Sequence, residues 1–323
     1  MTLKAVYTDT DDLDPTAGIE RLQAAGFEVL YLETHDPEKI VTAAMDADAL
    51  LLGYAPITAA MLAKMEKLQI VSLLSTGYDN IDIKAATDRE ICVSNIGATS
   101  AEEVATHALA LTLSISRGIE TYRKVAARRE WFKTPYPFIP PRLSAKNLGV
   151  VGFGNIGRQF AKIAQPLFKS VSFYDPMVKI GEVINGVESK DLDSILQDCD
   201  VISLHLPLLP TTHHLFNDQT FGKMKKGSVI INVSRGGLID PAALINALNS
   251  GQLLAAGLDV LESEPPIADD PLLSHPRVLI TPHVAFLSDY SMSAYIDVQA
   301  ENVMQWFEGK EVKNSVNGIR VKK

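Results

Sequence analysis

Three polar side chains suited to proton transfer and carboxylate binding each follow an apolar, strand-like run of the sequence. Arg235, Glu264 and His283 follow these runs, which are Val229–Val233, Ala255–Asp259 and Val278–Thr281. An imidazole exchanges a proton near neutral pH, and a carboxylate bonded to it fixes its tautomer and favours the protonated ring. A planar guanidinium binds a carboxylate through two hydrogen bonds and could polarise a neighbouring carbonyl. The three residues therefore predict acid–base chemistry on a small carboxylic acid.

Each of these residues also has an ordinary explanation that the local sequence leaves open. Loops at strand ends carry many arginines, and the chain has seven histidines, most of which must be structural or solvated. Glu262 competes with Glu264 as the acid, although the prolines after Glu264 constrain only that residue. His205 is a candidate only as a wall of a cofactor pocket, and Asp259 suits the carboxamide of a nicotinamide better than acid–base work.

A glycine-rich turn supplies the strongest indication of a cofactor. Gly152, Gly154 and Gly157 follow an apolar strand and open a helical pattern. In a dinucleotide site such glycines make the tight turn, admit the pyrophosphate and let helix pack on strand. Asp175 ends the next strand, where a carboxylate accepts hydrogen bonds from the adenosine ribose and repels a 2′-phosphate. Since the residues directly after Asp175 are Pro176 and Met177 and not an arginine, the pattern predicts NAD rather than NADP.

The elements that position these residues alternate between short apolar runs and helical patterns along most of the chain. This alternation predicts α/β architecture with two doubly wound parallel sheets. The first sheet is expected from the runs at 4–8, 27–33, 49–53, 70–74 and 91–94, and the second from those at 147–151, 171–174, 201–205, 229–233, 255–259 and 278–281.

The last helical pattern, from Tyr290 to about Glu308, is not followed by another strand, so we expect this helix to pack on the first sheet. The predicted organisation is a discontinuous substrate domain, 1–98 with 286–323, and an inserted NAD-binding domain, 99–285. The alternative is that the chain forms two consecutive domains, each made from one continuous stretch of sequence. A long helix from Ala101 to about Arg129, with the arm that follows it, is expected to form a dimer contact over 101–142.

Composition excludes several other classes of protein. The chain has 323 residues, 46% of them apolar, and a formal charge of −9, which opposes a sequence-independent grip on nucleic acid. Cys92 and Cys199 lie far apart in apolar contexts, without disulfide or zinc spacing. No signal-peptide core or membrane-spanning run is present, so we expect a cytoplasmic protein without a metal, a membrane or a nucleic-acid partner.

Five motifs in order make the chain resemble the D-isomer-specific 2-hydroxyacid dehydrogenase family over essentially its whole length. They are Gly152–Gly157 with Asp175, Asp200–Thr212, Ile231–Gly237, Gly257–Pro265 and Thr281–His283. The resemblance implies a Rossmann NAD domain inserted into a flavodoxin-like catalytic domain. It also implies that Arg235 holds the substrate carboxylate and carbonyl, that His283 exchanges the proton, and that Glu264 partners the imidazole.

Further roles follow from the resemblance alone. The positions expected to line the NAD site, besides the three glycines and Asp175, are Thr99, Asn155, Ile156, His205, Pro207, Thr212, Val233, Ser234 and Asp259. The backbone amides of Ser75, Thr76 and Gly77 are expected to cradle the substrate carboxylate. Tyr54, Tyr78 and Phe286 are candidates for an apolar side-chain pocket, as are Trp131 or Phe138 of a partner subunit.

The expected activity is hydride transfer between NADH and a small, non-phosphorylated 2-oxo acid by a homodimer. Segments such as Thr76–Lys84 are also similar to the C-terminal binding proteins, NAD-sensing transcriptional corepressors with the same fold. Phosphoglycerate dehydrogenase is a third candidate, but Gly53–Thr58 and Ser75–Asn80 contain none of the basic residues that a phosphorylated substrate needs.

Overall fold

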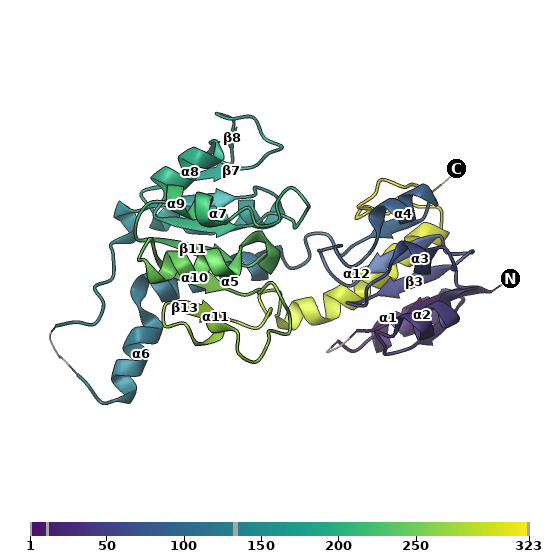
Figure 1. The fold of residues 1–323 in the computed structure, drawn as a ribbon. Coiled ribbons are helices and arrows are strands. Elements are labelled where there is room, and N and C mark those ends of the chain that lie inside the picture. Colours follow the sequence, from purple (N-terminus) through teal and green to yellow (C-terminus); the bar gives the residue numbers. More distant parts are fainter. Residues whose placement is uncertain (1, 11–12, 132–134, 322–323) are drawn as a thin grey trace. The chain divides into compact units, whose positions relative to one another are not determined.

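A computed structural model describes residues 2–10, 13–131 and 135–321 and divides the chain into two compact units. The first unit joins Met1–Thr99 to Leu287–Lys323, and the second is Ser100–Phe286 (Figure 1). Each unit contains its own sheet with helices on both faces, which confirms the predicted fold class of two doubly wound α/β domains. No helix in these three described stretches is long and apolar enough to cross a membrane.

The sheet of the first unit is entirely parallel, with strand order β2-β1-β3-β4-β5. Its alternate residues serve two cores: Val6 faces one helical layer, while Ala5 and Tyr7 face the other. The elements are β1 (Leu3–Tyr7), α1 (Thr16–Ala24), β2 (Phe27–Tyr31), α2 (Pro37–Ala44), β3 (Ala49–Leu52), α3 (Ala59–Leu62), β4 (Ile70–Leu73), α4 (Ile83–Asp88), β5 (Cys92–Ser94) and α12 (Asp289–Phe307).

Helix α12 packs on the first sheet, although the second unit separates it from that sheet in sequence. Ala300 and Val303 of α12 are fully buried in the core that contains Tyr7. The buried amide of Gln299 donates hydrogen bonds to the carbonyl oxygens of Leu52 (3.2 Å) and Ser72 (2.9 Å). Apolar contacts and hydrogen bonds together therefore fix this helix on strands β3 and β4.

The second sheet has the order β13-β12-β11-β10-β6-β7-β9-β8. Strands β6 and β10 are neighbours although β7 to β9 intervene in sequence, so the chain reverses its direction of winding there, where open α/β sheets bind ligands. The elements are α5 (Ala101–Arg117), α6 (Ile119–Ala127), η1 (Leu143–Ala145), β6 (Asn147–Val151), α7 (Asn155–Ala164), η2 (Gln165–Leu167), β7 (Ser170–Tyr174), β8 (Val183–Ile184), β9 (Val187–Ser189), α8 (Leu192–Asp198), β10 (Val201–Leu204), α9 (Asp218–Lys223), β11 (Ser228–Asn232), η3 (Gly236–Leu238), α10 (Pro241–Asn249), β12 (Leu253–Leu258), α11 (Pro271–Ser274) and β13 (Val278–Ile280).

The second sheet departs from the parallel pattern at one edge. Strand β8 pairs antiparallel with β9, and β9 pairs parallel with β7. The hairpin turns at Asn185 and Gly186, whose φ angles of 53° and 78° are left-handed. Asparagine followed by glycine favours such two-residue turns, so the sequence did carry a signal for this hairpin.

The expected single helix over 101–129 is also wrong, because the structure forms two helices. Gly118 separates α5 from α6 with a left-handed φ of 62°, and a Cβ at this position would meet the Phe138 ring at 2.5 Å. No residue of α6 is buried, and the helix stands off the second sheet (Figure 1). The predicted dimer segment 101–142 includes residues 132–134, which lie outside the described residues.

Candidate active site

The glycine loop between β6 and α7 shows why each of its three glycines is required. Gly152 has a φ of 95°, and a Cβ there would meet the backbone of His205 at 2.5 Å. A Cβ on Gly157 would collide with the carbonyl oxygen of Gly152, so its absence lets the helix start close to the strand. Nothing lies within 4 Å of the Cβ position of Gly154, which leaves its backbone open to a ligand. This division of roles fits a pyrophosphate at the start of α7.

Asp175 lies beside this loop, at the carboxyl end of β7. One of its carboxylate oxygens accepts the Phe153 N–H (2.7 Å) and the other accepts the Met177 N–H (2.9 Å). Because a carboxylate oxygen can accept more than one hydrogen bond, both retain capacity for ribose hydroxyls. Of the other predicted cofactor residues here, Asn155 is exposed and begins α7, and Ile156 packs against the core beneath the helix.

His205 ends β10 next to the glycine loop and is held as a neutral ring. Its Nε2 lies 2.9 Å from Ser203 Oγ, and its ring packs against Phe160 with centroids 5.0 Å apart. Nδ1 is buried without a hydrogen-bond partner, and burial lowers the pKa of the imidazole to about 3. The residue as a whole is half-buried, but because its Nδ1 is buried and the ring stays neutral, His205 is not suited to carry a proton near neutral pH.

The remaining predicted cofactor positions are fixed by hydrogen bonds to the backbone. Thr212 Oγ donates to the carbonyl of exposed Pro207 (2.7 Å) and accepts the Leu209 N–H (2.8 Å). Ser234 Oγ donates to the carbonyl of Leu204 (2.8 Å), beside buried Val233. Thr99 belongs to the first unit, where its hydroxyl donates to the Ile96 carbonyl (2.5 Å).

His283 and Glu264 form a hydrogen-bonded pair at the ends of two neighbouring strands, β13 and β12. Nδ1 of His283 lies 2.6 Å from Oε2 of Glu264, while Oε1 accepts the Leu261 N–H at 2.7 Å. Burial raises the pKa of Glu264, but the hydrogen bond and charge of His283, the Leu261 N–H and the charge of Arg235 outweigh it and hold the pKa below its usual value. The carboxylate is therefore ionised beside the imidazole.

Arg235 follows β11, close enough for its charge to affect Glu264. Its backbone is held by Asn232, whose side-chain amide donates to the Arg235 carbonyl at 2.9 Å. Nη1 donates to the Ser234 carbonyl at 2.9 Å, which directs one edge of the guanidinium. Arg235, Glu264 and His283 are thus gathered at one edge of the second sheet, as the ends of adjacent parallel strands require.

The two glycines after Arg235 let its turn pack closely on neighbouring loops. A Cβ on Gly236 would collide with the backbone of Leu261 and Glu262, and one on Gly237 would meet Leu208 at 3.1 Å. Gly236 therefore lets the Arg235 turn pack against the loop that carries Glu264.

Asp259 is a structural anchor of the His283 loop, a role missed by sequence reasoning. Its fully buried carboxylate accepts hydrogen bonds from Thr281 Oγ (2.6 Å) and from the N–H groups of Val284 (3.1 Å) and Ala285 (2.9 Å). Its carbonyl accepts the His283 N–H at 2.8 Å, and His283 has a left-handed φ of 54°. The only available signal was an acidic residue at the end of an apolar strand.

Glu262, the rival acid, points elsewhere in the structure. Its Oε1 lies 2.6 Å from Nε2 of His214, on a different turn of the second unit. Glu264 is thus the acid on His283, because each of the two carboxylates of this loop engages its own histidine.

The predicted substrate residues are divided between the two units. In the first unit, Ser75 Oγ donates to the Gly77 carbonyl (2.7 Å) and Thr76 Oγ to the Gly97 carbonyl (3.1 Å). Tyr54 is exposed, and Tyr78 packs against the core of its unit. Phe286 belongs to the second unit, where it packs against the core next to β13.

Comparisons with known proteins agree with this geometry. Residues 109–285 match the D-isomer specific 2-hydroxyacid dehydrogenase, NAD binding domain. The hydroxypyruvate reductase of Blautia hydrogenotrophica is 34% identical over 304 residues, covering 92% of this chain and 94% of that protein. The D-3-phosphoglycerate dehydrogenase of Methanocaldococcus jannaschii is 35% identical over 311 residues, 95% of this chain, but the match covers only 58% of its own length.

A solved structure matches the chain from end to end. It is the NADPH-dependent glyoxylate/hydroxypyruvate reductase from Sinorhizobium meliloti in complex with NADP and malonate, with a TM-score of 0.88 and 26% identity. The alignment covers 100% of this chain and 99% of that one. The protein is accordingly an NAD(P)-dependent oxidoreductase acting on CH–OH donors, and the chain belongs to the D-isomer specific 2-hydroxyacid dehydrogenase family.

Proposed function

We propose that this protein reduces a small, non-phosphorylated 2-oxo acid to the 2-hydroxy acid with NADH. The observation that carries the proposal is the arrangement of Arg235, Glu264 and His283 at adjoining strand ends, with Glu264 Oε2 2.6 Å from His283 Nδ1. A guanidinium, a carboxylate and an imidazole in this order provide carboxylate binding, charge balance and a mobile proton.

Each of the three side chains has one part in the reduction. Because Nδ1 of His283 is engaged by Glu264, Nε2 is the nitrogen that gives a proton to the substrate's carbonyl oxygen. Ionised Glu264 stabilises the imidazolium beforehand and fixes the ring's orientation. Arg235 binds the substrate carboxylate and polarises the carbonyl. When bound, NADH supplies the hydride for the carbonyl carbon.

We propose NAD rather than NADP as the preferred cofactor. Asp175 places a carboxylate beside the glycine loop, and Pro176 and Met177 follow it, so no guanidinium is supplied there for a 2′-phosphate. The reductase of Sinorhizobium meliloti is NADPH-dependent, which makes the comparison of the two cofactors a necessary part of the test.

The substrate is proposed to be an unphosphorylated acid such as glyoxylate or hydroxypyruvate. Two relatives act on these acids by name, and the loops Gly53–Thr58 and Ser75–Asn80 contain no lysine or arginine. Ser75, Thr76 and Gly77 remain proposed contacts of the substrate carboxylate on the resemblance alone. Tyr54, Tyr78 and Phe286 remain proposed contacts of its side chain on the same basis.

A panel assay tests this proposal directly. NADH and NADPH oxidation would be followed with glyoxylate, hydroxypyruvate, pyruvate, branched and aromatic 2-oxo acids, and 3-phosphohydroxypyruvate. We expect the highest kcat/KM with NADH and one of the two smallest polar acids. A preference for the phosphorylated acid or for NADPH would contradict the substrate or the cofactor assignment, respectively.

We also propose a homodimer formed through α6 and the segment after it. Ile119, Trp131, Tyr136 and Ile139 are large apolar side chains in strongly exposed positions, and Ile139 is 79% exposed. Large apolar side chains exposed within one segment of a chain are typical of interaction surfaces. Light scattering should give the mass of a dimer for the wild type and of a monomer for Ile139→Glu; a monomeric wild type would contradict the proposal.

A further inference from the structure

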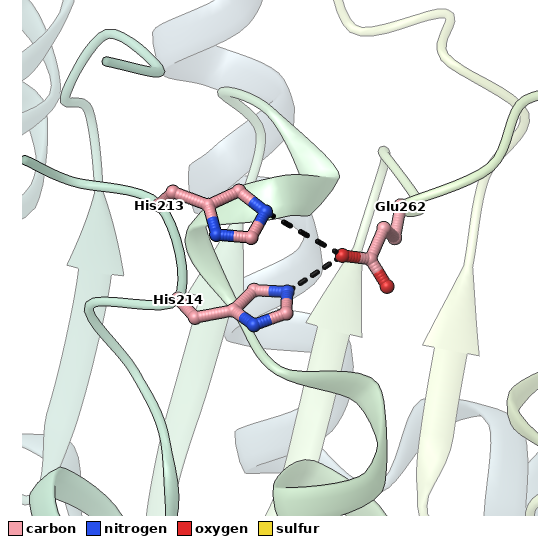
Figure 2. A group of neighbouring side chains, drawn as sticks. All are labelled: His213, His214 and Glu262. Carbon is pink, nitrogen blue, oxygen red and sulfur yellow. Dashed lines mark hydrogen bonds and ion pairs between the residues drawn. The ribbon is translucent and has the colours of Figure 1, made fainter. Parts of the chain in front are cut away.

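Three metal-ligand side chains from two turns of the second unit converge outside the Arg235–Glu264–His283 group. Nε2 of His214 lies 2.6 Å from Oε1 of Glu262, and Nε2 of His213 lies 3.8 Å from the same oxygen. The two imidazoles stack with centroids 3.9 Å apart and an interplanar angle of 23°. Figure 2 shows both rings presenting a nitrogen to one side of the carboxylate. The three ligand atoms lie within 4.8 Å of one another.

The donor set has the chemistry of a transition-metal site. Two imidazole nitrogens and one carboxylate oxygen suit Zn²⁺ and its neighbours, whereas Mg²⁺ and Ca²⁺ prefer oxygen ligands alone. Tetrahedral Zn²⁺ with bonds of about 2.0–2.2 Å separates its ligand atoms by roughly 3.3 Å. The two nitrogen-to-oxygen separations, 2.6 and 3.8 Å, lie on either side of that value, and all three ligand atoms lie within 4.8 Å of one another.

The backbone holds both turns in place before any ion binds. The His214 N–H donates to the Gly237 carbonyl at 2.8 Å, and His214 has a left-handed φ of 49°. A Cβ on Gly237 would meet the His213 ring at 3.6 Å, and Gly236 packs on the backbone of Glu262. Because folding has already ordered these turns, little conformational entropy remains to be lost on binding.

The cluster is accessible, and the other potential ligands among the described residues are less well suited to a metal ion. The side chains of His213, His214 and Glu262 are 53, 31 and 40% exposed, which leaves a path for the ion and room for water as a further ligand. Burial raises the pKa of both cysteine thiols, Cys92 and Cys199, to about 11, which disfavours the ligating thiolate. Elsewhere in the described stretches the histidine–carboxylate pairs contain a single histidine, as in His283–Glu264.

We propose that His213, His214 and Glu262 form a binding site for one Zn²⁺-like divalent transition-metal ion. The ion replaces the proton shared by His214 and Glu262 and ties the turn after Thr212 to the loop that carries Glu264. Neither hydride transfer nor the cofactor requires it, so this site stands independently of the proposed function.

Isothermal titration calorimetry with ZnCl₂ tests the site, using the full chain without an affinity tag after removal of metals by EDTA and desalting. We expect one ion per chain. His213→Gln, His214→Asn and Glu262→Gln should each weaken binding at least about tenfold. Asparagine is the replacement at His214 because it tolerates a left-handed φ, and circular dichroism verifies that each variant is folded.

Two further variants locate the ion. His275→Gln removes a partly exposed histidine of the same unit outside the cluster and should bind Zn²⁺ as the wild type does. His283→Gln should also retain binding. The proposal is wrong if the wild type binds no better than His214→Asn, or if affinity falls in His283→Gln and persists in the three cluster variants. The latter result would place the ion on the Glu264–His283 pair.

Discussion

Replacing Glu264 by glutamine tests the acid–base pair with the least change in shape. In the structure, Oε1 accepts the Leu261 N–H at 2.7 Å and Oε2 pairs with His283 Nδ1 at 2.6 Å. A glutamine side chain has one acceptor oxygen and one donor amide, so if its oxygen accepts the Leu261 N–H, its amide nitrogen faces His283 Nδ1 and can bond only a deprotonated Nδ1. Glu264→Gln must therefore lose the stabilisation of protonated His283, the contact to Leu261, or part of each.

The expected loss follows from the strength of a charged hydrogen bond. Such a bond contributes about 1.5–3 kcal/mol, and the side chains of His283 and Glu264 are 38 and 35% exposed, so solvent screening favours the lower part of that range. A loss of about 1.5–2 kcal/mol in the transition state lowers kcat roughly ten- to thirtyfold, since about 1.36 kcal/mol corresponds to a factor of ten.

The same substitution should shift the pH profile in a defined direction. Reduction needs the protonated imidazole, which the wild-type carboxylate favours, so the variant should lose activity at lower pH than the wild type as the pH rises. Burial raises the pKa of Glu264, but the hydrogen bond and charge of His283 outweigh it and hold that pKa below its usual range, so the wild-type carboxylate is ionised near neutral pH. Protonation of Glu264 itself therefore does not explain any change seen between about pH 5 and pH 8.

The assay is kcat for NADH oxidation with the best 2-oxo acid across that pH range, in the presence of EDTA. Glu262→Gln is the matched control, because it makes the same substitution on the same loop but engages His214 rather than His283. The loss of kcat in Glu262→Gln should be far smaller than that in Glu264→Gln. Equal losses in the two variants, or a Glu264→Gln profile identical to that of the wild type, would refute the assignment of the pair.

Four other predictions concern the proposed carboxylate-binding arginine, the buried carboxylate of Asp259, two glycines of the glycine loop and the acid beside that loop. Arg235→Lys should raise KM for the 2-oxo acid at least about tenfold in steady-state kinetics, since an ammonium cannot form two parallel bonds; an unchanged KM would remove Arg235 from carboxylate binding. Asp259→Asn should lower the free energy of unfolding in urea by about 1–3 kcal/mol, because an amide cannot accept all three hydrogen bonds; a smaller change would mean that the carboxylate does not anchor the loop. Gly157→Ala should lower the melting temperature, whereas Gly154→Ala should leave it unchanged but raise KM for NADH; the reverse order would contradict the proposed pyrophosphate contact. Asp175→Ala should raise kcat/KM with NADPH relative to NADH, and a wild type that already prefers NADPH would overturn the cofactor proposal.

Most of the fold could be predicted because buried parallel strands are apolar throughout and separated by helical patterns. The runs at 70–74 and 201–205 have this character, and both form central strands. Strands β8 and β9 were missed because two or three residues are too few to show a period. The break at Gly118 depends on the Phe138 ring, and a helical pattern contains no information about a partner so far along the chain.

The candidate site could be predicted in part for a topological reason. Polar residues at the ends of neighbouring parallel strands must share one edge of the sheet, which brings Arg235, Glu264 and His283 together. The choice between Glu262 and Glu264 could not be made from the sequence, because both lie in one loop and only the structure shows which histidine each carboxylate engages. The buried contacts of Asp259 were likewise hidden, since they join a strand end to backbone groups of a distant loop.

Backbone contacts, more than side-chain contacts, set the relative positions of the three reactive groups. The turn of Arg235 is held against the Glu264 loop because Gly236 has no Cβ. His283 is held through its own N–H on the Asp259 carbonyl, independently of its imidazole. Substituting a reactive side chain should therefore leave the backbones of the other two residues in place, although the loss of Glu264 also frees the His283 ring. A substitution at Gly236 should instead shift the Arg235 turn against the Glu264 loop, and one at Asp259 should shift the His283 loop, and reactive groups need their relative positions to within a fraction of an ångström.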